Sequence, residues 1–234
     1  MPNTEQLWVH KPLYTQGKTQ PQNRLAIHPD TRHTTREQPR RGIGGIESGY
    51  PTLDAALKGN GWPRGAMTEI LMDQSDNGEL ALLLPALAAI TQSGQMVTLV
   101  NPPFIPHAPT LAAAGIRLEK LLILHPRSQR DELWAMEQTL QSGCCGALLS
   151  WQSGRQAADR DLRRLQQAAR DGHCAHFYFR PSSCAQSPAA LRLRLAVDDE
   201  QLHVQLLKRH GGPAGQRLRL PLSAGLSHRQ RQLH

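Results

Sequence analysis

The chain has 234 residues, a length that fits one domain of about 150 residues with extensions. Its 27 Lys and Arg against 19 Asp and Glu give a formal net charge of +8, which is typical of proteins that meet nucleic acid or acidic partners. No stretch approaches the roughly 18 apolar residues that span a bilayer, and no CxxC pair occurs among the four cysteines. The sequence therefore argues against a membrane protein, a disulfide framework and a zinc site, and we expect a cytoplasmic protein.

The positive charge lies at the two ends of the chain. Residues 1–41 carry 7 Lys/Arg and 3 Asp/Glu, and residues 192–234 carry 8 and 3, which leaves 12 and 13 for the middle. Residues 1–45 are rich in Gln, Thr, Pro, Arg and His without apolar periodicity, so we predict a disordered basic leader. Residues 211–234 are predicted to be a basic flexible tail. These ends either touch DNA non-specifically or only keep the protein soluble.

Between the ends, short apolar segments alternate with segments of helical period. The expected strands are Met67–Met72, Met96–Val100, Leu121–Leu124, Gly146–Ser150 and Ala175–Phe179. The expected helices are Glu79–Ser93, Pro109–Ala114, Gln129–Gln141 and Asp159–Asp171. Pro85 should kink the first of these helices or delay its start. This alternation predicts an α/β domain over residues 46–210 with a mainly parallel sheet covered on both faces.

The pattern changes after the last of these strands. Segments Ala190–Val197 and Gln201–Leu207 alternate strictly around an acidic turn, which predicts an antiparallel C-terminal β-hairpin at one edge of the sheet. On its first strand the leucines would face the core, and Arg192 and Arg194 would face outward. One more strand is possible at Gln216–Leu220.

The segment IESGYPTLDAALKGNGWPRGAMTEIL, residues 46–71, resembles the approach to the nucleotide site in RecA-type ATPases. There it leads into a Walker A loop, whose Lys reaches the phosphates and whose Ser/Thr holds Mg²⁺. Here, aligned on Gly78, Glu79 stands at the Lys position and Leu80 at the Ser/Thr position. Carboxylates at this place would repel a triphosphate. We expect Asp73, Asp76 and Glu79 to form a solvated loop and a charged first helical turn rather than a metal site.

The similarity to RecA extends over about residues 46–181, and the other nucleotide-handling positions are also replaced. The loop that carries the catalytic Glu in RecA is Asn101-Pro102-Pro103 here, and the strand GALLSW has Ser150 where the Walker B strand has Asp. The strand FYF ends in Arg180-Pro181 in place of a polar sensor. The resemblance thus implies a RecA-like, P-loop-type core with a degenerate nucleotide site, no catalytic residues, no cofactor and no enzyme activity.

Two families of RecA-like proteins without an ATPase site resemble the chain. The ImuA family shares TLDAALKGNGWPRGAMTEIL, NPPFIPHAPTLAAAGI, ELWAMEQTLQSGCCGALLSW and KRHGGPAG. It implies an adaptor in SOS-induced translesion DNA synthesis that works with an ImuB-like protein and a DnaE-type accessory polymerase, and that contacts RecA. The SulA family shares a shorter core, with TEIL, LLLPAL, GALLSW and FYFRP, and implies a division inhibitor that binds FtsZ. The lead before residue 66 and the GGP segment favour ImuA.

Several side chains are candidates for partner binding. Trp62 and Trp151 either fill the space of the missing nucleotide or anchor a protein interface, where Trp is enriched in hot spots. Arg160, Arg163 and Arg164 share a helical face by spacing, which is either simply solvated or contacts an acidic partner or DNA. Arg192 and Arg194 on the hairpin would also favour an acidic partner.

Overall fold

The computed structural model describes residues 44–57, 61–73, 78–152, 156–184, 187–198, 201–209, 212 and 214–222. The predicted leader lies outside this part of the chain except for its last two residues. Asp76 lies outside it too.

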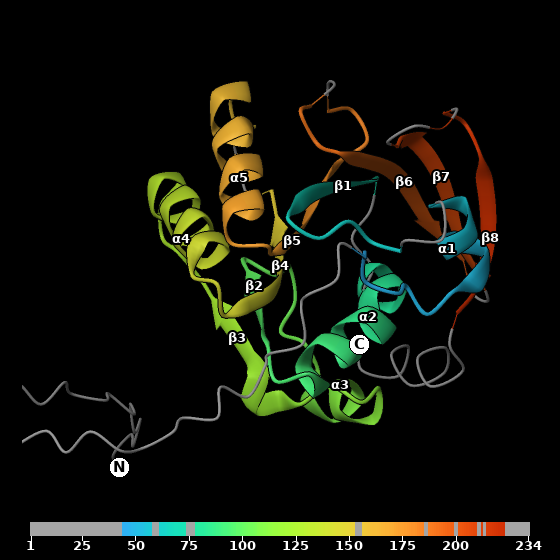
Figure 1. Cartoon of the computed structure of the whole chain (residues 1–234), viewed down its shortest axis with the longest axis horizontal. Helices are drawn as coiled ribbons and strands as arrows, with labels where there is room; N and C mark the ends of the chain where they lie inside the picture. The colour runs from blue at the N-terminus through green and yellow to red at the C-terminus, as the bar shows by residue number, and fades with distance from the viewer. Residues whose placement is uncertain are drawn as a thin grey trace, which may run out of the picture. The chain divides into compact units, whose positions relative to one another are not determined.

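The described chain forms one eight-stranded sheet in the order β3-β2-β4-β5-β1-β6-β7-β8 (Figure 1). The strands are β1 Ala66–Met72, β2 Met96–Val100, β3 Leu121–Leu124, β4 Cys145–Trp151, β5 Ala175–Pro181, β6 Leu191–Val197, β7 Gln201–Lys208 and β8 Arg217–Pro221. All neighbours from β3 to β6 pair in parallel, and only β7 and β8 run antiparallel to their neighbours. The predicted α/β fold with a mainly parallel sheet is confirmed.

The helices cover the two faces of this sheet. They are α1 Pro51–Ala56, α2 Gly78–Gln92, α3 Ala108–Ala113, α4 Gln129–Gln141 and α5 Asp159–Asp171, with a 3₁₀ turn at Leu118–Lys120. The helix α2 packs on one face in the larger apolar cluster, whereas α4 and α5 lie side by side on the other face (Figure 1). In the part of the chain that is described, no helix has the length and apolar character needed to cross a membrane.

Pro85 neither delays nor shortens α2, which begins at Gly78. A proline has no N–H, so the carbonyl of Ala81, four residues earlier, loses its usual helical donor. The hydroxyl of Tyr50, which is buried, donates a hydrogen bond of 3.2 Å to that carbonyl. The lead segment thus supplies the partner that the proline removes, as a buried backbone carbonyl requires.

The C-terminal hairpin is confirmed, but its predicted place at the sheet edge is wrong. Strand β6 pairs with β1, and β8 covers the outer side of β7. The further strand considered at Gln216–Leu220 is present as β8, Arg217–Pro221, so the sheet extends into the segment 211–234 that was predicted to be a flexible tail.

Arg192 does not face solvent as predicted. It is 8% exposed and forms an ion pair with Glu69, a fully buried residue at the middle of β1. The same carboxylate also pairs with Arg180 from β5, whose side chain is 1% exposed. Arg180 further donates to Gln152, and Arg192 donates to the carbonyl of Cys184. One carboxylate therefore joins β1, β5 and β6, and this group is called the Glu69 triad below.

Replacing Glu69 with Gln should destabilise the fold strongly. The substitution leaves two buried guanidinium groups without their counter-charge, and breaking a buried ion pair costs about 3–5 kcal/mol. The free energy of unfolding in urea measures the effect, with Arg194→Gln as a control at an exposed position of β6 that should change it by less than about 0.5 kcal/mol. A loss below about 1 kcal/mol for Glu69→Gln would contradict the role assigned to the triad.

Candidate functional site

The position of the nucleotide loop lies where the end of β1 leads to the start of α2. Residues 74–77 of that loop are outside the described chain, but the first turn of α2 is within it. Glu79, at the Walker A Lys position, is 1% exposed, so the expected solvated turn is wrong. Its Oε1 accepts a hydrogen bond of 3.3 Å from Nε1 of Trp151 at the end of β4. A carboxylate and an indole thus meet where a P-loop protein presents an ammonium group to phosphate.

Both tryptophans that were candidates either for filling the space of the missing nucleotide or for anchoring a protein interface are buried. Trp151 is 7% exposed and stacks on Phe179, with ring centroids 4.8 Å apart. Trp62 is fully buried, lies edge-on to Phe177, and exchanges two backbone hydrogen bonds with Ile46. Neither side chain offers a surface to a partner, because each completes the apolar cluster on the α2 face. The alternative, that they fill space near the degenerate site, agrees with these contacts.

Ser150, at the Walker B Asp position, is buried and bonded within the sheet. Its Oγ lies 2.8 Å from Nε2 of His176 on the neighbouring strand β5. His176 is completely buried, and this desolvation lowers its pKa to about 3 because the protonated form would lose its hydration. The hydroxyl is therefore engaged by a neutral imidazole, a pair that the sequence did not predict.

A further hydrogen bond, which was not predicted from the sequence, lies at the end of β2. Asn101, at the position of the RecA catalytic Glu, has a left-handed backbone with φ of 51°. Its side-chain amide donates a hydrogen bond of 3.1 Å to Glu132, which is 5% exposed in the first turn of α4. The edge thus carries a carboxylate, but it comes from a helix and is tied to Asn101. The pair lies 31 residues apart in the chain, with no motif spacing to indicate it.

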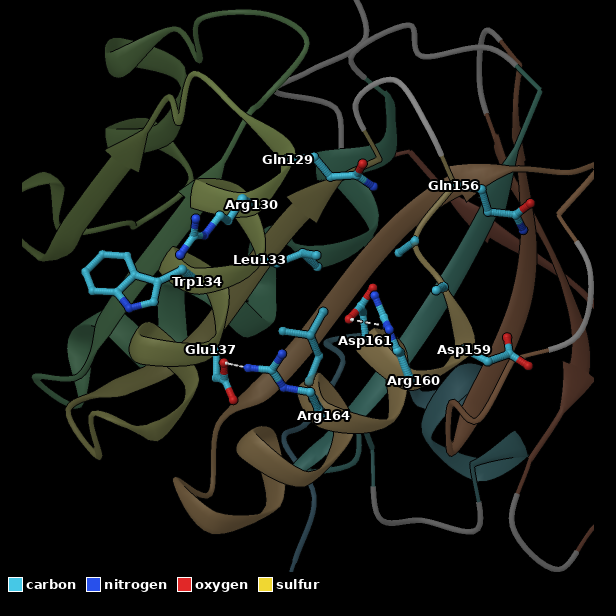
Figure 2. Close-up of a pocket in the computed structure, with 13 residues that line it drawn as sticks. Gln129, Arg130, Leu133, Trp134, Glu137, Gln156, Asp159, Arg160, Asp161 and Arg164 are labelled. Carbon is cyan, nitrogen blue, oxygen red and sulfur yellow. Dashed lines mark hydrogen bonds and ion pairs between the residues drawn. The ribbon is translucent and has the colours of Figure 1, made fainter.

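A groove of about 900 Å³ runs between α4 and α5 on the other face (Figure 2). Arg160 and Arg164 line it, whereas Arg163 is exposed but does not. Arg164 pairs with Glu137 across the groove at 2.5 Å, and Arg160 lies 3.7 Å from Asp161 on its own helix. The predicted arginine face is therefore divided, and two of its three members are balanced by nearby carboxylates.

The groove also exposes an aromatic side chain that was not among the candidates. Trp134 on α4 is 63% exposed and lines the groove beside Arg130 and Leu133. Figure 2 shows its indole extending from α4 away from the Arg164–Glu137 pair. The helical period could have indicated this exposure, because Glu132, Met136 and Leu140 form the buried face of α4.

The described residues contain no candidate metal site. Within that part, no three His, Cys, Asp or Glu side chains gather in a metal-binding arrangement. Asp73 is exposed at the end of β1, and Glu79 is engaged with Trp151.

The buried histidine generates a prediction about pH. Below about pH 6.5 His176 takes up a proton in the unfolded chain, whereas in the folded chain it stays neutral down to about pH 3. The free energy of unfolding therefore decreases as the pH is lowered from about 6.5 to about 3. The contribution is roughly 1 kcal/mol per pH unit. Urea unfolding at several pH values should give a steeper fall for the natural chain than for His176→Gln, and parallel curves would contradict this account.

Known proteins resemble part of the chain in sequence. A family model described as "Cell division inhibitor SulA" matches residues 65–176. RecA of Arthrospira platensis is 39% identical over 100 residues, which are 42% of this chain and 26% of that protein. RecA of Chlorobaculum parvum is 36% identical over 101 residues, 42% of this chain and 28% of the relative. The chain thus spans little more than a quarter of the length of these relatives.

The same resemblance holds for the fold. The crystal structure of the RadB recombinase superposes with a TM-score of 0.58 at 16% identity, covering 75% of this chain and 95% of that one. At this identity the match shows a shared fold. Together with the sequence similarities, it supports the assignment of the α/β core to the RecA/SulA-like superfamily.

Proposed function

We propose that the protein is a non-catalytic adaptor of SOS-induced translesion DNA synthesis, of the ImuA type. In this proposal it acts in the cytoplasm with an ImuB-like protein and a DnaE-type accessory polymerase, and it contacts RecA. The observation that carries the proposal is the buried contact of Glu79 with Trp151 at the degenerate nucleotide site. A RecA-like core that has given up ATP retains its surfaces for protein binding.

The electrostatics of α2 support the loss of nucleotide binding. The amino end of a helix carries a partial positive charge that P-loop proteins offer to phosphate. In this chain Glu79 in the first turn of α2 places a carboxylate at that end, and the indole of Trp151 donates to it. A triphosphate would have to displace this contact and approach a negative charge in a poorly solvated place. No cofactor is therefore proposed.

The groove between α4 and α5 is the surface proposed for the ImuB-like partner. The indole of Trp134 is 63% exposed, so its burial by a partner would make the free energy of binding more favourable. Trp is also enriched among interface hot spots. Arg130 and Arg160 lie on the same groove and supply hydrogen-bond donors at its rim. The groove therefore combines an aromatic anchor with a polar border.

A SulA-type inhibitor of cell division that binds FtsZ is the second candidate. The observation in its favour is the match of the SulA family model to residues 65–176, the segment that runs from just before β1 into β5. The same groove lies within this segment. The two candidates differ in the partner that they require.

Binding of the purified chain to the ImuB-like protein and to FtsZ from its own source organism separates the two functions. We expect the ImuB-like protein to bind and FtsZ not to bind in biolayer interferometry. Trp134→Ala should weaken the complex about tenfold or more, because loss of a hot spot costs about 2 kcal/mol. Phe104→Ala, at another exposed aromatic residue that does not line the groove, is the matched control and should have little effect.

Binding of FtsZ alone would favour the SulA-type function. A complex with the ImuB-like protein that Trp134→Ala leaves unchanged would keep the adaptor role and exclude the groove. If the chain binds neither the ImuB-like protein nor FtsZ, both candidate functions are contradicted.

A further inference from the structure

The outer face of the three strands β6, β7 and β8 presents positive charge in an ordered pattern. Arg194 on β6 is in register with Gln205 on β7, which is in register with Arg217 on β8. Arg219 lies two residues beyond Arg217 and is paired with His203. Residues paired across antiparallel strands share a face, and the leucines that alternate with them are turned to the core. The three arginines therefore share one open face, called the basic sheet face below.

The other basic side chains of this region are engaged in contacts within the fold. Arg192 belongs to the Glu69 triad, Arg209 donates to the carbonyl of Ala56 on α1, and the ammonium group of Lys208 lies 3.4 Å from the carbonyl of Ser187.

The three arginines of the basic sheet face differ from them in this respect. Arg194, Arg217 and Arg219 are exposed, and within the described chain none of their guanidinium groups has a hydrogen bond or an ion pair. Their charges are thus available to a ligand.

The acidic residues nearest in sequence to these strands are Asp198, Asp199 and Glu200, between β6 and β7, and the structure describes Asp198 among them. Asp198 lies at its rim, but its carboxylate is 2.6 Å from His203 and also accepts the backbone N–H of Gln201. The sequence from residue 201 to residue 234 contains six Lys or Arg and no Asp or Glu. The charge of this surface therefore favours an anionic ligand.

We propose that the basic sheet face binds the sugar–phosphate backbone of a nucleic acid. Arg presents a planar fork that matches phosphate oxygens. Neighbouring strands lie about 4.8 Å apart, so Arg194 and Arg217 are separated by about 10 Å, and Arg217 and Arg219 by about 7 Å along β8. A cluster of this size contacts a few successive phosphates. This inference does not depend on the adaptor function or on its partners.

The make-up of the face favours nucleic acid over an acidic protein. Protein interfaces are built around apolar or aromatic anchors. The large exposed apolar side chains of the described residues are Phe104, Ile105, Leu118, Leu122 and Trp134, and none of them lies on β6, β7 or β8. Among the described residues of this face there is no Phe, Tyr or Trp ring on which a base could stack, and the imidazole of His203 is paired with Asp198. We therefore expect contacts to phosphates that are independent of sequence.

The salt dependence of binding tests the proposal. Fluorescence anisotropy would be recorded with the full chain and a labelled DNA single strand of about 30 nucleotides, and with the corresponding duplex, between roughly 50 and 200 mM salt. Each phosphate contact contributes about 0.7–0.9 to the slope of log K against log salt. The variant Arg194→Gln, Arg217→Gln, Arg219→Gln should reduce the slope by about 2 and the affinity at low salt by more than about tenfold.

The control variant carries the same loss of charge outside β6, β7 and β8: Arg117→Gln, Arg127→Gln and Arg170→Gln. These three arginines are exposed, and the control should keep the natural slope. Binding of the strand, the duplex or both with this difference between the variants supports the proposal and identifies the form that is bound. The proposal is overturned if neither DNA binds, if the two variants behave alike, or if poly-glutamate competes as well as DNA at equal charge.

Discussion

The buried carboxylate of Glu69 is the interaction on which the arrangement of the sheet depends. It balances two guanidinium groups, from Arg180 on β5 and Arg192 on β6, on either side of β1. Isolated charges in this place would be costly, so the ion pairs hold together only when all three strands are aligned. The triad thereby links the parallel RecA-like core to β6, β7 and β8. Through β6 it fixes the base from which the basic sheet face extends.

At the positions that correspond to the nucleotide site of RecA-type proteins, polar groups of the fold bond to one another. Glu79 bonds to Trp151, Ser150 to His176 and Asn101 to Glu132. Each pair joins positions that handle nucleotide in RecA-type proteins to a neighbouring element of the same core. The partners proposed above are assigned instead to two exposed surfaces, the groove with Trp134 and the basic sheet face. They are built on different elements and can be altered separately.

The elements were predictable from sequence because their signals are local. Apolar runs, helical period and the glycines after Gln92 and Asp171 placed the strands and helices closely. The errors concern contacts between distant residues. Strict alternation predicted that Arg192 faces outward, but Glu69 lies 123 residues away, and no local pattern shows that the two meet. Glu79 was expected in solvent because its donor, Trp151, is 72 residues distant. The exposure of Trp134 could have been predicted from the helical periodicity of α4. The burial of Trp62 against Phe177 could not, because it depends on a contact between residues far apart in the sequence.

Isothermal titration of the full chain with Mg-ATP tests the central claim most directly, because the adaptor function proposed above assumes that the site formed by the start of α2 and the end of β4 does not serve a nucleotide. The account predicts no binding in the micromolar range, since Glu79 and Trp151 occupy the position of the phosphate-binding Lys and bond to each other. Residual millimolar binding through backbone donors agrees with it. Micromolar affinity, lost when Mg²⁺ is removed, would contradict it and restore the chain to the nucleotide-dependent RecA-like proteins.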